Sequence, residues 1–390
     1  MKTFSFTSSL AIVATSAILF AACSSAASTA PTESAAASTA PSESAAASTA
    51  PSESAAPKTY VIGYSNGGGV GNGFREEQVC TAKAQAKASG QVSNLNVIHR
   101  NTDAAGQLSD LRSLIAAGVN AIVFNPNDPN ALNPALKEAH DAGIATVSVD
   151  AFVTDPNTWN LYNNQVKYAE IGAKWLFDQL GGKGTVWYTR GLAGHPADSD
   201  RDIGFKNVLK DYPNIKVVPN NDGVFTGWDP AKTTQLANDF ISSGQYDKID
   251  GIWASGMGKQ IVDAIKAANK PFVPIADADI GGFVAQLLDP TNFPGLKGAA
   301  VTNTASVGGA GITLALKLLD GETVTASAGA KPNTILLDPV LLDNLTDAGK
   351  AGLKAWVSVP GMDPLWPLSL AIQGWTTYDP NTVPASCKGA

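Results

Sequence analysis

Short apolar segments of strand length alternate along most of the chain with amphipathic segments of helix length. The first cycle reads YVIGYS, NGFREEQVCTAKAQAKASG and LNVIHRN, and VNAIVFNP and IATVSVD follow with helical stretches between them. The strand segments are rich in Val and Ile, and three of the helical segments end at a glycine, which readily adopts the left-handed C-cap. This alternation predicts parallel strands with helices on both faces of the sheet.

A second series of the same kind begins with KYAEIGAKWLFDQLGGKG and continues through TVWYTRG, IKVVP, IDGIWASG and FVPIADAD. We therefore predict an α/β protein with two similar doubly wound parallel-sheet lobes joined by a hinge. The first lobe is expected at 58–164 plus about 303–335, and the second at 165–302 plus about 336–345. A C-terminal extension, 346–390, contains Pro and Trp residues and is expected to wrap the first lobe.

The N-terminal end of the chain has a different character. Lys2 precedes the apolar run LAIVATSAILF, and small residues follow up to Cys23, which is the pattern of a secretory signal peptide at 1–22. The run is too short to span a membrane. LFAAC resembles a bacterial lipobox, from which Phe20 departs, and an ordinary cleaved signal is the alternative. We expect lipidation of Cys23, and thus an extracytoplasmic protein attached to the cell membrane by an N-terminal lipid.

A ten-residue repeat occurs three times between the signal peptide and the globular part, as ASTAPTESAA, ASTAPSESAA and ASTAPSESAA. The unit contains no aromatic or large aliphatic side chain that could pack against a neighbouring repeat. Residues 23–57 are therefore predicted to be a disordered tether.

Charge and cysteine content narrow the function classes. The formal net charge is −7 and there are no basic runs, so nucleic-acid binding is not expected. Lipidation of Cys23 would leave Cys80 and Cys387 as an even pair in an oxidising compartment, which favours a disulfide between them.

Polar residues follow the predicted strands in both series. Because ligands of open α/β sheets bind outside the carboxyl ends of the strands, these residues predict one shared cleft. They are Ser65, Asn66, Asn125, Asp150, Arg190, His195, Asp279 and Asn303.

Signatures of catalysis and of cofactor binding were sought in the same segments. NGGGVGNG lacks the register of a dinucleotide-binding loop, and GGKGT lacks the spacing of a phosphate loop. Ser255 lacks the nucleophile elbow, and none of the three histidines has zinc-type spacing with another ligand. The aspartates around Arg201 suit helix caps better than a carboxylate pair. We therefore predict no catalytic residues, no metal and no cofactor.

Four phrases, in their order and spacing, carry a resemblance to a known family. They are GVGNGF, AGQLSDLRSLIAAGVNAIVFNPNDPNALNPALKEAHDAGIATVSVD, DSDRDIGF and VPIADAD. With them the stretch from Tyr60 to Asp338 resembles the sugar-binding lipoproteins of ABC importers with the type I periplasmic-binding-protein fold, as in ribose-binding proteins. The resemblance implies a monomer that captures a monosaccharide or related polyol and delivers it to an ABC permease.

The resemblance also implies which residues face the ligand. The first lobe would contribute Asn72, Phe74, Asn125 and Asp150, and the strand-end residue Asn66 would join them; the second would contribute Arg201, Trp228 and Asp279, and a hinge crossing Thr302 or Asn303. Arg201 would donate to neighbouring hydroxyls, and the two aspartates would accept from them.

Two departures from the ribose-binding pattern weaken ribose as the ligand. Ala151 stands where those members carry an arginine, and Gly256 stands where they carry an asparagine. Arg75 and His195 are hypothesised to replace the lost donors. Two other functions remain open at this point, a sensory sugar receptor without transport and an enzyme that acts on a glycoside.

Overall fold

The computed structural model describes residues 58–68, 71–357 and 359–387. The predicted signal peptide, the lipidation site Cys23 and the repeat tether lie outside these ranges. Within the described ranges, no helix is both long enough and apolar enough to cross a membrane.

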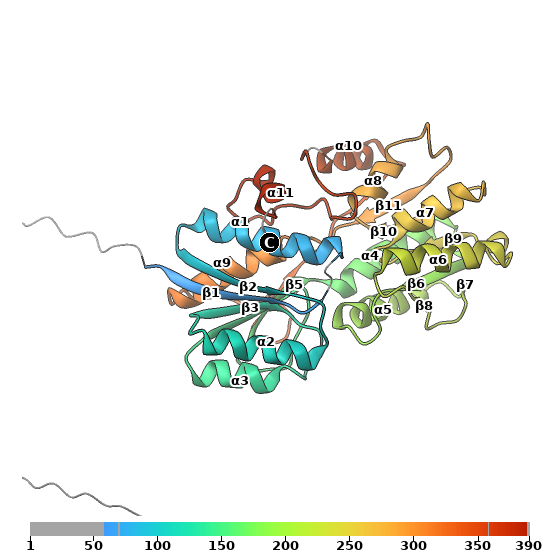
Figure 1. The fold of residues 1–390 in the computed structure, drawn as a ribbon. Coiled ribbons are helices and arrows are strands. Elements are labelled where there is room, and N and C mark those ends of the chain that lie inside the picture. The colour runs from blue at the N-terminus through green and yellow to red at the C-terminus, as the bar shows by residue number, and fades with distance from the viewer. Residues whose placement is uncertain (1–57, 69–70, 358, 388–390) are drawn as a thin grey trace, which may run out of the picture. The chain divides into compact units, whose positions relative to one another are not determined.

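The first of two sheets has six parallel strands in the order β12-β5-β4-β3-β1-β2. Its strands are β1 (Tyr60–Asn66), β2 (Val92–His99), β3 (Ala121–Asn125), β4 (Ala145–Val149), β5 (Trp159–Asn163) and β12 (Thr334–Leu337). Its helices are α1 (Gly73–Ser89), α2 (Ala104–Ala116), α3 (Asn133–Asp141) and α9 (Val307–Leu319). We call this sheet with its four helices the first lobe (Figure 1).

Strand β3 shows why the central strands of this sheet carry continuous runs of apolar residues. Ala121 and Val123 pack with the α1 and α9 side chains, whereas Ile122 and Phe124 pack with those of α2 and α3. Because successive side chains of a strand point to opposite faces, a sheet covered on both faces needs apolar residues at every position.

The second sheet has the order β13-β11-β10-β9-β6-β7, with β8 paired to β6. Its strands are β6 (Lys183–Arg190), β7 (Asn214–Val218), β8 (Val224–Phe225), β9 (Gly251–Trp253), β10 (Ile275–Ala278), β11 (Gly298–Val301) and β13 (Leu341–Asp343). Its helices are α4 (Gln165–Gln179), α5 (Pro196–Leu209), α6 (Pro230–Ser242), α7 (Gly258–Ala267) and α8 (Gly281–Leu287), with a short 3-10 turn η1 (Tyr246–Lys248). We call this assembly the second lobe.

Helices cover both faces of the second sheet as well. On β6, Trp187 stacks on Phe240 of α6, and the next residue, Tyr188, stacks on Phe205 of α5. The prediction of an α/β protein with two doubly wound parallel-sheet lobes is confirmed. The edge strand β13 is an exception within it, since it runs antiparallel to β11.

The chain passes between the two sheets at three places, after β5, after β11 and after β12. Two of these passages are bonded to each other, because Thr302 N–H donates to the Val340 carbonyl and Val340 N–H donates to Thr302 Oγ1 at 2.8 Å. The passages therefore lie side by side, as a hinge requires.

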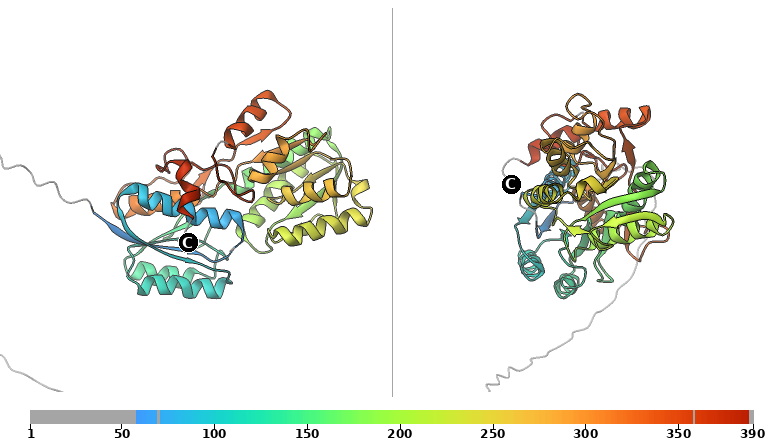
Figure 2. Two further views of the ribbon diagram at one scale, coloured as in Figure 1. Left: turned by 45° about the horizontal axis from the view of Figure 1, so that its top comes forward. Right: turned by 90° about the vertical axis from the view of Figure 1, so that its right-hand side faces the viewer.

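The C-terminal extension contacts both lobes, whereas the sequence suggested only the first. Helix α10 (Asp347–Trp356) packs on the second lobe through Leu353. Residues 359–387, which we call the strap, then run to the first lobe and include η2 (Pro380–Thr382) and α11 (Val383–Ser386). The red C-terminal segments accordingly lie over both halves of the molecule in Figure 2.

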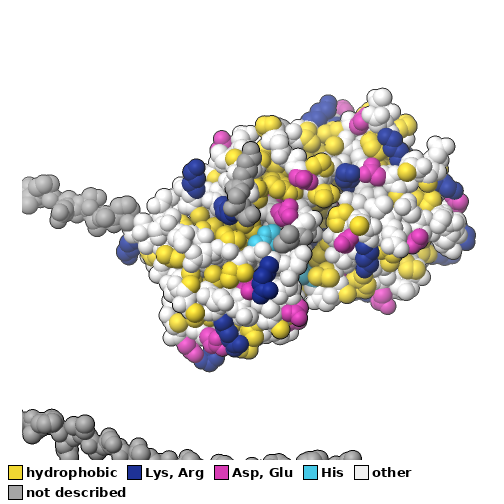
Figure 3. Space-filling view, viewed as in Figure 1, with side chains coloured by type: hydrophobic (Ala, Val, Ile, Leu, Met, Phe, Trp, Pro, Cys, Tyr) yellow, Lys and Arg dark blue, Asp and Glu magenta, His cyan; other side chains and the backbone are white. Residues whose placement is uncertain are grey.

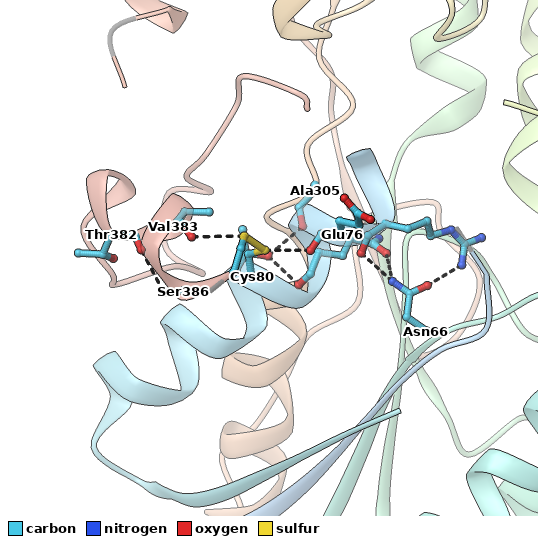
Figure 4. The surroundings of a disulfide bond; sticks show 11 residues. Asn66, Glu76, Cys80, Ala305, Thr382, Val383 and Ser386 are labelled. Atoms are coloured by element: carbon cyan, nitrogen blue, oxygen red, sulfur yellow. Dashed lines mark hydrogen bonds between the residues drawn. A yellow bond between two sulfur atoms is a disulfide. The ribbon is translucent and has the colours of Figure 1, made fainter. Parts of the chain in front are cut away.

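The end of the strap lies against α1. Trp366, Leu370, Tyr378 and Val383 pack with Cys80 and Ala84 of α1. The sulfur atoms of Cys80 and Cys387 lie together, with a Cα–Cα distance of 4.8 Å (Figure 4). That separation is within the range of natural disulfides.

Candidate ligand-binding site

A cavity lies between the two lobes, at the carboxyl ends of strands from both sheets. Sixteen residues line it: Asn72, Gly73, Phe74, Arg75, Asp150, Ala197, Arg201, Trp228, Pro230, Gly256, Met257, Gln260, Ala278, Ile280, Asn303 and Leu365. This is the location expected of a ligand site in an open α/β sheet.

On the first-lobe side, two buried amides hold the charged groups of the cavity. Asn66 at the end of β1 accepts from Arg75 Nη1 at 2.8 Å and donates to the Arg75 carbonyl at 2.9 Å. Asn125 at the end of β3 donates to Asp150 Oδ2 at 3.1 Å and to Gln78 Oε1 at 2.9 Å. Neither amide lines the cavity, so both act through Arg75 and Asp150.

Asp150 follows β4 and is 4% exposed. Burial raises the pKa of its carboxyl, while the charges of Arg75 and Arg201 and a hydrogen bond from Asn125 oppose that rise. It is the one acidic side chain among the described residues that line the cavity. Hydrolysis of a glycoside by the common mechanism uses two carboxyl groups, and this lining supplies one.

On the second-lobe side, Arg201 of α5 is held by stacking and by hydrogen bonds. Its Nε donates to Gln165 Oε1 at 2.7 Å and its Nη1 donates to the Ser255 carbonyl at 3.3 Å. The guanidinium lies 4.2 Å from the centre of the Tyr168 ring and 5.5 Å from that of Trp228. It forms no ion pair with Asp198 or Asp202, because Arg190 pairs with both of them instead.

The backbone is strained around this arginine. Trp228 has φ 52° and Ser255 has φ 48°, and Asp150 across the cavity has φ 68°. Left-handed conformations are uncommon outside glycine and concentrate at functional sites. Trp228 Nε1 donates to the Ser255 carbonyl at 2.8 Å, and a side chain at Gly191 would come within 2.0 Å of the indole ring. The fold therefore holds this ring in one place.

Polar side-chain contacts join the lobes across the cavity. Arg75 Nη2 lies 2.9 Å from His195 Nε2, and Asn72 Nδ2 donates to the Trp228 carbonyl at 3.2 Å. His195 also caps α5, because its Nδ1 lies 3.2 Å from Ala197 N–H. A neutral imidazole carries one proton, so it accepts at only one of these nitrogens. Burial and the charges of Arg75 and Arg201 hold the pKa of His195 well below 6.5.

The structure brings seven of the twelve predicted ligand-binding residues to the cavity wall, and five lie outside the lining. The seven are Asn72, Phe74, Arg75, Asp150, Arg201, Trp228 and Asn303. The five are Asn66, Asn125, His195, Asp279 and Thr302.

Asp279 shows that a position at the end of a strand does not by itself bring a side chain to the cavity wall. Its Oδ1 accepts from Asn303 N–H at 2.9 Å and its Oδ2 accepts from Ser369 N–H at 3.1 Å. Both oxygens thus bind backbone groups of a hinge passage and of the strap rather than facing the cavity. Thr302 is engaged in the same way by Val340.

Several wall and support residues were not identified from the sequence. Gln165 donates to Asn303 Oδ1 at 2.9 Å and to Asp150 Oδ1 at 3.4 Å, and it accepts from Arg201. Its position at the start of a helix that follows a strand is a signal that could have found it. Met257, Gln260 and Ile280 line the second-lobe side, and Leu365 comes from the strap, for which the local pattern holds no signal.

Residues 62–323 match the model of the "Periplasmic binding protein domain" family. The chain belongs to this family. The two relatives described below are named as binding proteins. In the part of the chain that the structure describes, no group of three or more His, Cys, Asp or Glu side chains could hold a metal ion.

This periplasmic binding protein is similar to curated sugar-binding and polyol-binding proteins. It is 29% identical over 227 residues to the xylitol-binding protein of Mycolicibacterium smegmatis, covering 57% of this chain and 63% of that one. It is 29% identical over 231 residues to the galactofuranose-binding protein of Escherichia coli, covering 57% of this chain and 70% of that one. The chain thus spans about two thirds of the length of these relatives.

Solved structures show the same fold. An ABC transporter solute binding protein from Thermobispora bispora superposes with a TM-score of 0.68 at 25% identity, over 79% of this chain and 90% of that one. One from Mycobacterium smegmatis with bound glycerol superposes with a TM-score of 0.64 at 25% identity, over 77% and 97%.

Proposed function

We propose that this periplasmic binding protein is the extracytoplasmic component of an ABC importer and captures a monosaccharide or a related polyol between its lobes. One observation carries the proposal: Asp150 from the first lobe and Arg201 from the second line the same cavity, each fixed by buried partners. The relatives named for xylitol and galactofuranose support the same ligand class.

The lining suits the chemistry of a polyol. Each hydroxyl both donates and accepts, so it needs an anionic acceptor such as Asp150 and donors such as Arg75 and Arg201. Phe74 and Trp228 offer flat apolar surfaces for the C–H faces of a sugar ring. Because the partners come from both lobes, the ligand gains its full set of bonds only when the lobes are together, which favours closure.

The proposal assigns no reaction to the site. Among the described residues, the lining offers a single carboxylate and no nucleophile with an adjacent base, so capture without turnover is expected. Incubation with sugars and with aryl glycosides tests this point. Released aglycone or altered sugar would show an enzyme.

The partner and the location are part of the proposal. An ABC permease would accept the closed, liganded monomer. On the face shown in Figure 3, basic and acidic side chains are scattered, and no basic patch supports nucleic-acid binding. We expect Cys23→Ala to release the protein from membranes into the soluble fraction. Continued membrane association of that variant would contradict the lipid anchor.

We also propose a disulfide between Cys80 and Cys387. It would close a loop with a sequence separation of 307 and is supported by the 4.8 Å Cα–Cα distance. Such a loop stabilises the fold by up to roughly 5 kcal/mol in the chain-entropy model. Labelling of free thiols in the unfolded, unreduced protein tests it, and two reactive thiols in the mature protein would contradict it.

The binding proposal is tested by thermal shift and calorimetric titration over pentoses, hexoses and polyols, including xylitol. A ligand at a hundred times its Kd stabilises the folded state by about 2.7 kcal/mol, which moves the melting temperature measurably. Arg112→Ala is the control and should show the same ligand-induced shifts as the wild type, because Arg112 pairs with Glu138 on the exposed surface and does not line the cavity. A protein that none of these compounds stabilises would not be a sugar or polyol receptor.

A further inference from the structure

The strap makes a fourth connection between the lobes, beside the three passages of the hinge. On the second lobe, Gly281 N–H donates to the Trp366 carbonyl and Gly282 N–H donates to the Pro364 carbonyl, both at 2.7 Å. Next to these bonds, Ile280 and Pro367 form an antiparallel bridge. The strap segment that holds Leu365 is thereby paired with the chain next to the cavity wall.

On the first lobe, the strap is held at several further points. Ser306 Oγ donates to the Ser369 carbonyl at 3.1 Å, and Gln85 exchanges two hydrogen bonds with Thr377, at 2.8 and 2.9 Å. Beyond them, Cys387 meets Cys80 of α1 (Figure 4). The family match ends at residue 323, so the strap lies outside the matched residues.

The strap brings Leu365 into the cavity at the start of α1. A side chain at Gly73 would come within 2.3 Å of the Leu365 carbonyl oxygen, which shows how closely the two segments approach. Leu365 lines the cavity together with Phe74, Met257 and Ile280. These four side chains contain no hydrogen-bonding group apart from the weakly accepting thioether of Met257.

Several backbone donors on the second-lobe side of this apolar wall are already engaged. The N–H groups of Gly281 and Gly282 bind the strap carbonyls, as described above, and the Asp279 carboxylate binds Asn303 and Ser369. A ligand hydroxyl placed against Leu365 and Ile280 would therefore lose water without gaining a partner from these engaged groups. A methyl or methylene group at the same position would instead bury apolar surface.

We propose that the strap, through Leu365, selects deoxy sugars or polyols, in which hydrogen replaces one hydroxyl and leaves a methyl or methylene group at that position. The inference rests on the proposed function and adds the ligand's chemical class to it. The polar end of such a ligand lies at Asp150, Arg75 and Arg201, and its deoxy end lies against Leu365.

Matched pairs of sugars test the proposal on the mature protein by calorimetric titration. The pairs are D-fucose with D-galactose, L-rhamnose with L-mannose, and 5-deoxy-D-ribose with D-ribose. In at least one pair the deoxy sugar should bind about tenfold more tightly than its partner. Leu365→Ser should reduce that ratio to about threefold or less, mainly by weakening the deoxy sugar.

Ile203→Ser is the matched control, because Ile203 is an apolar residue of α5 that is 51% exposed and does not line the cavity. It should leave the ratio unchanged, and circular dichroism should show that both variants are folded. Equal or tighter binding of the hydroxylated partner in every pair that binds, or an unchanged ratio in Leu365→Ser, would overturn the proposal. If the wild-type protein binds polyols or sugars only outside these pairs, the deoxy selection is wrong while the receptor function stands. If it binds no sugar or polyol at all, the proposed function itself fails.

Discussion

The two sides of the cavity are built by different means. On the first-lobe side, Arg75 and Asp150 are backed by buried amides, Asn66 and Asn125, that orient each charged group by hydrogen bonds. On the second-lobe side, Arg201 lies between the rings of Tyr168 and Trp228, on a backbone that turns through left-handed residues. The first side is a hydrogen-bonded network in the core of its lobe, and the second is a stack of flat groups.

The difference indicates what each side contributes to recognition. A network of fixed amides sets the direction of individual hydrogen bonds, so the first side should read the positions of hydroxyl groups. A stack of aromatic rings and a guanidinium presents broad surfaces, so the second side should hold the ring and tolerate variation in it. Substitutions on the two sides should therefore differ in what they change.

The largest effect is expected from Asp150→Asn. Asparagine tolerates the left-handed backbone at this position, but it removes the anionic acceptor and leaves Arg75 and Arg201 facing each other's charge. Affinity for the bound sugar should fall by about 2–5 kcal/mol, while the melting temperature of the unliganded protein should fall little or rise, because burial penalises the native charge. Calorimetric titration and thermal melting measure the two effects.

Asp155→Asn is the control for that variant. Asp155 is another buried aspartate of the first lobe, and it accepts from Thr158 N–H and Oγ1 away from the cavity. Its replacement should lower stability and leave affinity unchanged. A loss of affinity of the same size in both variants would show that the first-lobe side acts through general stability.

Arg201→Lys examines the second-lobe side at constant charge. Lysine lacks the planar fork that reaches Gln165 and Ser255 and stacks on Tyr168, so affinity should fall by about 1–3 kcal/mol. Because the loss is of surface contact, closely related sugars should weaken by similar factors. Arg190→Lys is the control, since Arg190 pairs with Asp198 and does not line the cavity. An unchanged affinity in Arg201→Lys would remove this arginine from the site.

Asn125→Ala tests the supporting amides of the first-lobe side. The change removes the donor to Asp150 Oδ2 and should cost about 1–2 kcal/mol of affinity, although Asn125 itself does not line the cavity. The loss should differ between epimers of the bound sugar, because the direction of the carboxylate changes. Asn160 is a buried amide of β5 that donates and accepts outside the cavity, so Asn160→Ala should change stability and leave affinity unchanged. Equal losses for all epimers would contradict the directional role.

The smallest effect concerns Glu77, which lies in α1 behind the first-lobe side and is fully buried, with no hydrogen-bond partner to either carboxylate oxygen. Burial, and then the charge of Asp279, raises its pKa well above 4.5. The folded protein therefore holds this proton more tightly than the unfolded chain does, and the associated stability is lost as pH rises through the raised pKa. Glu77→Gln should match the wild type near pH 4 and melt at a higher temperature at pH 7.5.

In the same experiment, Glu138→Gln should change the stability at neutral pH in the opposite direction. Glu138 is exposed and pairs with Arg112, which lowers the pKa of its carboxyl. Its amide variant should be slightly less stable than the wild type at neutral pH and equal to it in acid. If the difference in melting temperature between Glu77→Gln and the wild type is the same at both pH values, the buried carboxyl does not titrate in this range.

The sequence by itself determined the two lobes and their sheets. Strand and helix periodicities are local properties, and a segment such as AIVF, apolar at every position, has to be covered on both faces wherever it lies. The same logic placed Asp150 near the cleft, because the carboxyl ends of parallel strands meet at one edge, whereas Arg201 and Trp228 were expected there only from the resemblance to sugar-binding proteins. The antiparallel direction of β13 was not predicted, since nothing in the three residues LLD specifies a strand's direction.

Only the tertiary structure decided which of the strand-end groups face the cavity. Asp279 carries the same chemistry as Asp150, but the N–H of Ser369, ninety residues further along the chain, takes one of its oxygens. Leu365 likewise reaches the wall through contacts distant in sequence, because the strap that carries it is held by both lobes and its Cys387 lies against Cys80. A buried polar group binds whichever partner the packed chain brings within about 3 Å, and that partner is chosen by segments far away in sequence.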